Sequence, residues 1–105
     1  MLTYPTRHMI KIETLAQILS TYLQGHFDKV EIDKMQRTHK NDGSAFRINA
    51  DGEAYTVIIT DDAFADDTPS EDIIQSLGQY NLANVMSDLS GFAVTVTDSG
   101  CIFEN

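Results

Sequence analysis

The sequence has little of the chemistry that usually marks an enzyme, a secreted protein or a membrane protein. Its 105 residues include one cysteine and no tryptophan. A single cysteine, Cys101, cannot close an internal disulfide, as is typical of a reducing compartment. The longest apolar runs span only a few residues, and no basic segment precedes an apolar one. We therefore expect neither a transmembrane helix nor a secretory signal, and we expect a soluble, cytoplasmic protein.

Basic side chains are missing from more than half of the chain. All seven of them lie in the first 47 positions, where five acids reduce the net charge to +2. Residues 48–105 contain eleven acids and no lysine or arginine, so the whole chain carries −9. Nucleic acids and anionic membranes are polyanions, so we expect no direct binding to either. A modest basic edge could form on the first hairpin, although acids are interleaved with its basic residues. These are Lys29, Lys34, Arg37, Lys40 and Arg47.

The length and the apolar content of 42% allow one hydrophobic core. We expect residues 9–105 to form a single α+β domain. Residues 1–8 differ from the rest, because His8-Met9 is a dipeptide that a common cloning junction leaves before a native start. We expect them to be a remnant of that junction or a flexible arm.

Apolar residues at helical spacing predict a first helix over residues 12–23. Thr14 and Gln17 could form a capping box, or the helix could begin one turn earlier. Gly25 is well placed to end it. His26 follows near the apolar stripe, so we expect its ring to pack against the core rather than to bind a ligand.

Three segments with a period of two predict a strand meander with one wet face. They lie at residues 29–33, 46–50 and 54–60. Asp51-Gly52 joins the last two with a two-residue signal for a type I′ turn, and residues 38–44 form a longer polar loop.

A second helix is expected after Thr68, with a capping hydroxyl at that residue, proline at the first helical position and Glu71 in the first turn. Its apolar stripe runs to Leu89, and Gly78 either allows a close approach or marks a break. Residues 92–103 predict a final hairpin that turns at residues 98–100. The expected order is α-β-β-β-α-β-β, an α+β fold with two helices packed on an antiparallel sheet.

Motifs for catalysis and for metal binding are absent. The sequence contains no glycine-rich phosphate loop, no G-x-S-x-G nucleophile elbow and no H-E-x-x-H zinc motif. The three histidines are too scattered to suggest a zinc site. Cys101 lies in an expected strand, where it is interpreted as a small buried hydrophobic residue. We therefore predict a protein that is not an enzyme, with no catalytic residues, no metal site and no cofactor.

The segment between residues 61 and 72 holds six acids and one aromatic residue. We name as candidate interaction residues Asp61, Asp62, Phe64, Asp66, Asp67, Glu71 and Asp72. Clustered carboxylates also suit Ca²⁺ or Mg²⁺, but their order is not that of an EF-hand loop. On one interpretation Phe64 is an apolar anchor ringed by negative charge. On the other it packs beneath the third strand, and only the acids face water.

These patterns favour a non-catalytic interaction protein that binds a basic surface on another macromolecule. It could be an inhibitor or an immunity-type factor that imitates the charge of nucleic acid. A small ligand-binding or enzymatic α+β domain is an alternative of a different class.

The order of elements is also similar to that of small acidic type III secretion chaperones. Residues 15–23 correspond to the first helix of that family, and residues 81–103 to its final helix and hairpin. The family's third helix, expected after Phe103, has no counterpart in this sequence. The resemblance implies a homodimer that binds an unfolded segment of an effector, and so self-association is the alternative to a basic partner.

Overall fold

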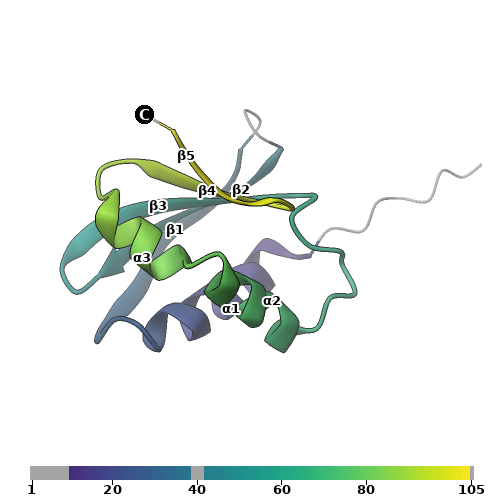
Figure 1. Cartoon of the computed structure of the whole chain (residues 1–105), viewed down its shortest axis with the longest axis horizontal. Coiled ribbons are helices and arrows are strands. Elements are labelled where there is room, and N and C mark those ends of the chain that lie inside the picture. The colour runs from purple at the N-terminus through teal and green to yellow at the C-terminus, as the bar shows by residue number, and fades with distance from the viewer. Residues whose placement is uncertain (1–9, 39–41, 105) are drawn as a thin grey trace, which may run out of the picture.

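The computed structural model describes residues 10–38 and 42–104 as one sheet covered by helices (Figure 1). Its helices are α1 (Ile12–Gln24), α2 (Ser70–Gln79) and α3 (Leu82–Asp88). Its strands are β1 (Val30–Thr38), β2 (Gly43–Ala50), β3 (Glu53–Thr60), β4 (Ala93–Thr97) and β5 (Gly100–Glu104). The predicted α+β class is confirmed. The predictions for residues 1–8 and for Lys40 fall outside the described residues.

The five strands lie in sequence order across the sheet. The meander β1-β2-β3 and the hairpin β4-β5 are antiparallel, as expected. The pair β3-β4 is parallel, because the connection through α2 and α3 returns the chain in the direction of β3. The three helices of the described residues lie on the same side of the sheet (Figure 1). None of them covers the other side, which we call the uncovered face.

The first helix begins at Ile12, the earlier of the two expected starts, and no side chain caps it. Gly25 ends it with an ordinary φ of −79° rather than the left-handed conformation. The prediction for His26 is wrong, because the helix stops before this residue and leaves its side chain exposed. Its ring lies beside that of Tyr22, with the two centroids 4.7 Å apart and the ring planes tilted by 47° to each other.

The second predicted helix is two helices. Asn81 has a φ of 60° and interrupts the chain between α2 and α3. Asparagine tolerates this left-handed conformation better than most residues do. Gly78 is exposed, with open space where a Cβ would lie, so it does not serve a close approach. The cap predicted at Thr68 is also wrong, because Pro69 occupies the N-cap position and no side chain caps α2.

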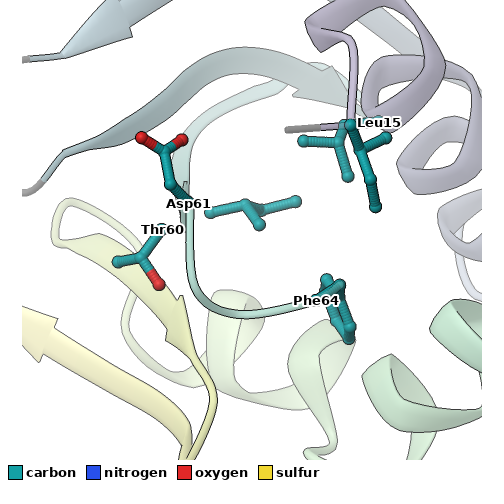
Figure 2. Close-up of a pocket in the computed structure, with 6 residues that line it drawn as sticks. Leu15, Thr60, Asp61 and Phe64 are labelled. Atoms are coloured by element: carbon teal, nitrogen blue, oxygen red, sulfur yellow. The ribbon is translucent and has the colours of Figure 1, made fainter. Parts of the chain in front are cut away.

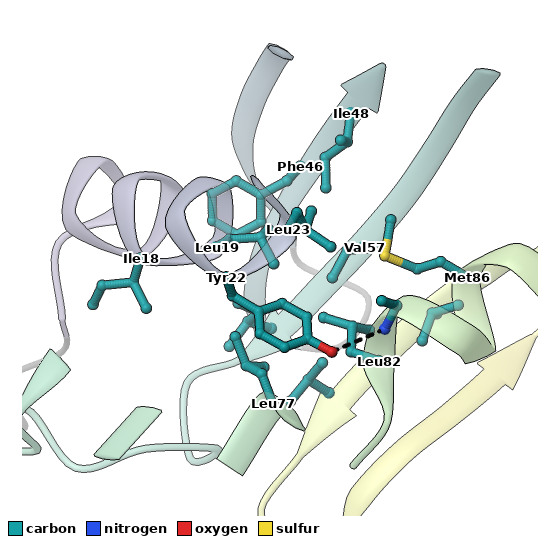
Figure 3. Packing of buried hydrophobic residues seen from close by; sticks show 14 of the residues in the cluster. Ile18, Leu19, Tyr22, Leu23, Phe46, Ile48, Val57, Leu77, Leu82 and Met86 are labelled. Carbon is teal, nitrogen blue, oxygen red and sulfur yellow. Dashed lines mark hydrogen bonds between the residues drawn. The ribbon is translucent and has the colours of Figure 1, made fainter. Parts of the chain in front are cut away.

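The core lies between the three helices and the covered face of the sheet (Figure 3). Its fully buried side chains include Leu19 and Leu23 from α1 and Phe46 from β2. The stripe that predicted α1 is the face that packs here. Tyr22 also reaches across to α3, where its hydroxyl accepts a hydrogen bond of 3.1 Å from the Ala83 N–H (Figure 3). This bond satisfies one of the free N–H groups at the start of α3.

A tight turn at one end of the meander and a close approach of two strands at the other hold it in register. Asp51 and Gly52 have φ values of 52° and 87°, which confirms the predicted type I′ turn. The Asp51 carboxylate also accepts a 2.8 Å hydrogen bond from the Lys29 N–H, which ties this turn to the start of β1. At the opposite end, a Cβ added to Gly43 would lie 2.5 Å from the Ile59 carbonyl oxygen, so this approach of β2 to β3 requires glycine.

Thr95 is buried on the side of the sheet that no helix covers. It alternates with the core residues Val94 and Val96, and its register partners are Ile58 on β3 and Ile102 on β5. Its side chain is only 2% exposed, and its hydroxyl has no hydrogen-bond partner among the described residues. A buried hydroxyl without a partner lowers stability.

Thr95→Val is therefore expected to raise the free energy of unfolding by about 1 kcal/mol, because it replaces the unpaired hydroxyl with a methyl group of similar shape. Urea unfolding followed by circular dichroism measures the change. Thr97→Val is the matched control, because the Thr97 hydroxyl donates to the Gly100 carbonyl at 3.0 Å and this bond would be lost. A Thr95→Val protein no more stable than the wild type would contradict the prediction.

Candidate functional site

The acidic residues predicted as a site lie along one connection, which leads from the end of β3 to the first turn of α2. We call residues 61–72 the acidic connection. It passes from the sheet layer to the helix layer at one edge of the fold (Figure 1). Five of its six acids are exposed, namely Asp62, Asp66, Asp67, Glu71 and Asp72. The connection therefore presents a negative edge to solvent.

Asp61 differs from the other five acids because it is held in an ion pair. Both of its carboxylate oxygens accept hydrogen bonds of 2.6 Å from the two terminal nitrogens of Arg37 on β1. This two-pronged contact raises the pKa of Arg37, and only 16% of the Asp61 side chain is exposed. Within the described residues this is the one ion pair. Asp61 thus anchors the start of the acidic connection to β1 and contributes little free charge.

Phe64 is partly buried and packs against the core beside Ile10, Leu15 and Ile59. The Asp61 carboxylate points away from this apolar group (Figure 2). The cavity that they line holds about 10 Å³, which is room for one water molecule at most. Phe64 therefore supports the connection from beneath and does not project as an anchor for a partner.

Glu71 and Asp72 occupy the first turn of α2. Negative side chains at this position stabilise a helix, because the free N–H groups give its N-terminus a partial positive charge. These two acids thus have a structural role in addition to any role in binding. Asp66 and Asp67 precede α2 and so do not stabilise its first turn in this way. The Asp62 carboxylate accepts a 2.7 Å hydrogen bond from the Thr60 hydroxyl.

The described part of the chain holds no cluster of metal ligands. No three histidine, cysteine or acidic side chains gather within it closely enough to hold a metal ion. Cys101 is half-buried, and burial raises the pKa of its thiol to about 11. No helix among the described residues is long and apolar enough to cross a membrane.

A hollow on the uncovered face of the sheet was not predicted from the sequence. It holds about 140 Å³, and its lining includes Lys34, Gln36, Arg47 and Thr56. The sequence does contain a signal for it, because Lys34 and Gln36 occupy positions where the alternation that Val30 and Ile32 begin would place apolar residues.

Comparison with known proteins returns no match: no family model, no curated protein and no solved structure is similar to this chain.

Proposed function

We propose that the protein is a non-catalytic interaction module whose acidic connection docks on a basic surface of another macromolecule. The observation that carries the proposal is the exposure of five neighbouring carboxylates without a paired cation in the described residues. An inhibitor or an immunity-type factor would use such a surface, and a partner that normally holds nucleic acid would offer the matching charge.

The position of Arg37 supports this proposal. Arg37 neutralises Asp61, which is the most buried acid of the connection, and leaves the exposed ones free. The ion pair holds the start of the acidic connection against β1, and the other five carboxylates keep this edge negative. Such a surface increases the rate of encounter with a basic partner, and the effect weakens as salt screens the charge.

Neutralising the exposed acids is expected to weaken binding to a basic probe about tenfold at low salt, because each exposed charge contributes a fraction of a kcal/mol. The quadruple variant Asp66→Asn, Asp67→Asn, Glu71→Gln and Asp72→Asn removes four of them. Titration calorimetry with a ten-residue lysine peptide, in 20 mM and 500 mM NaCl, measures the affinity.

The matched control removes four exposed acids elsewhere, with the changes Glu13→Gln, Glu31→Gln, Asp88→Asn and Asp98→Asn. Both variants then carry the same net charge. Circular dichroism checks that each is folded, because Glu71 and Asp72 also stabilise α2. Equal loss of affinity in both variants would show that only net charge matters, and the proposal would then be wrong. The same pair of variants used as bait in an extract of the source cell identifies the natural partner.

Self-association through the uncovered face of the sheet is a second candidate. Ile102 on β5 is 49% exposed, next to Thr95 and Ile58 on this face. A second copy that covered this face would bury the exposed Ile102 side chain, and the resemblance to dimeric secretion chaperones implies such a contact. Light scattering in 500 mM NaCl separates the two candidates, because an apolar contact persists in salt and charge docking does not.

A further inference from the structure

Two cations lie side by side on the uncovered face of the sheet. Lys34 on β1 is the direct register partner of Arg47 on β2, and Arg47 in turn faces Thr56 on β3. Side chains at directly opposed positions have Cβ atoms only about 5 Å apart. With Gln36 they line the hollow of about 140 Å³, roughly ten times the space that one water molecule needs.

A β-bulge places Lys34 in this position. The register runs from Ile32 opposite Ile48 directly to Lys34 opposite Arg47, so Asp33 is the extra residue. Without the bulge, Lys34 would follow Ile32 onto the covered face and Asp33 would lie opposite Arg47. The bulge thus replaces an attractive Asp33–Arg47 pair with a repulsive Lys34–Arg47 pair. Bulges commonly redirect a side chain next to a functional site.

The two cations have no ion-pair partner among the described residues, and the nearest acid on this face by register is Glu31, opposite Asn49. No carboxylate in the described part of the chain lines the hollow. Like charges at directly opposed positions destabilise a sheet. Two of the seven basic residues of the chain are placed in this way. A negative group bound between them would offset their repulsion.

We infer that the hollow binds a phosphate group, either as the free ion or as a phosphate monoester. The Arg47 guanidinium offers paired N–H donors that match two phosphate oxygens, and the Lys34 ammonium supplies a second positive charge. The Thr56 hydroxyl and the Gln36 amide add neutral donors for the remaining oxygens. The net charge of the chain opposes binding only weakly, because salt screens charges beyond about 8–10 Å.

The test follows backbone amide signals of the ¹⁵N-labelled protein by NMR while sodium phosphate is added, with sodium chloride adjusted to keep the ionic strength constant. Saturable shifts are expected at residues 34, 36, 47 and 56, half complete at low-millimolar phosphate. Arg47→Gln is expected to weaken this binding at least tenfold. Lys29→Gln is the matched control, because it removes an exposed basic residue of the same hairpin that does not line the hollow. Phosphoserine, titrated in the same way, distinguishes a monoester from the free ion by the tighter of the two affinities.

A second measurement separates a binding role from a structural one. Without phosphate, Arg47→Gln is expected to raise the melting temperature by about 2 °C, because it removes the repulsion from Lys34. Phosphate should then stabilise the wild type and leave Arg47→Gln unchanged. Shifts that rise linearly without saturating, or that Arg47→Gln and Lys29→Gln weaken equally, would overturn the assignment.

Discussion

Replacing Phe46 with alanine is expected to lower the free energy of unfolding by about 3–5 kcal/mol. Phe46 is fully buried near the middle of β2, where it faces the helices. The substitution removes the ring from contact with the core and leaves a cavity, because neighbours in a packed interior relax only partly. Small domains unfold at a cost of about 5–15 kcal/mol, so the variant would be close to the limit of folding. Urea unfolding followed by circular dichroism measures the loss.

Met35→Ala is the control for this prediction. Met35 is the register partner of Phe46 on β1 and points to the same side of the sheet, but its side chain is 40% exposed. A side chain that keeps much of its contact with water loses less on truncation, so we expect a cost of about 1 kcal/mol. Similar losses for the two variants would mean that the space between α1 and β2 is not the centre of the core.

The elements that could be predicted from the sequence are those set by local periodicity. The stripe of α1 and the turn at Asp51-Gly52 have their cause within a few neighbouring residues, and both are found as expected. The break at Asn81 could not be predicted, because an asparagine within an apolar stripe is compatible with a continuous helix. The bulge at Asp33 could not be placed for a related reason: the change of phase along β1 is visible in the sequence, but only the pairing with β2 shows which residue is the extra one.

In the candidate site, too, the features set by neighbouring residues could be predicted, and those set by contacts between distant residues could not. The run of acids between residues 61 and 72 is a local feature, and its exposure follows from its charge. The ion pair that removes Asp61 from that run joins residues 24 positions apart, and only the pairing of β1, β2 and β3 brings Arg37 to it. Phe64 could be interpreted in two ways from the sequence, and its place beside Leu15 depends on how α1 packs.

Cys101 is expected to react with iodoacetamide at pH 8 between about tenfold and about a hundredfold more slowly in the folded protein than in 8 M urea. Burial raises the pKa of its thiol from 9.0 to about 11, so the fraction of reactive thiolate at pH 8 falls by about a hundredfold. A thiolate of higher pKa is intrinsically more nucleophilic, which offsets this fall by up to about tenfold. Because Cys101 is the one cysteine of the chain, mass spectrometry of the alkylated protein reports this site alone.

The pH dependence identifies the cause of the slow reaction. With a pKa of about 11, the folded-state rate should rise about tenfold for each pH unit from 8 to 10, whereas the rate in urea should level off near pH 9. The unfolded thiol ionises at lower pH than the folded one, so the unfolded state loses its proton first. The folded protein therefore loses stability as the pH rises from about 9 toward 11. A folded-state rate that levelled off near pH 9 would show an ordinary thiol, and steric shielding rather than a raised pKa would then explain any slow alkylation.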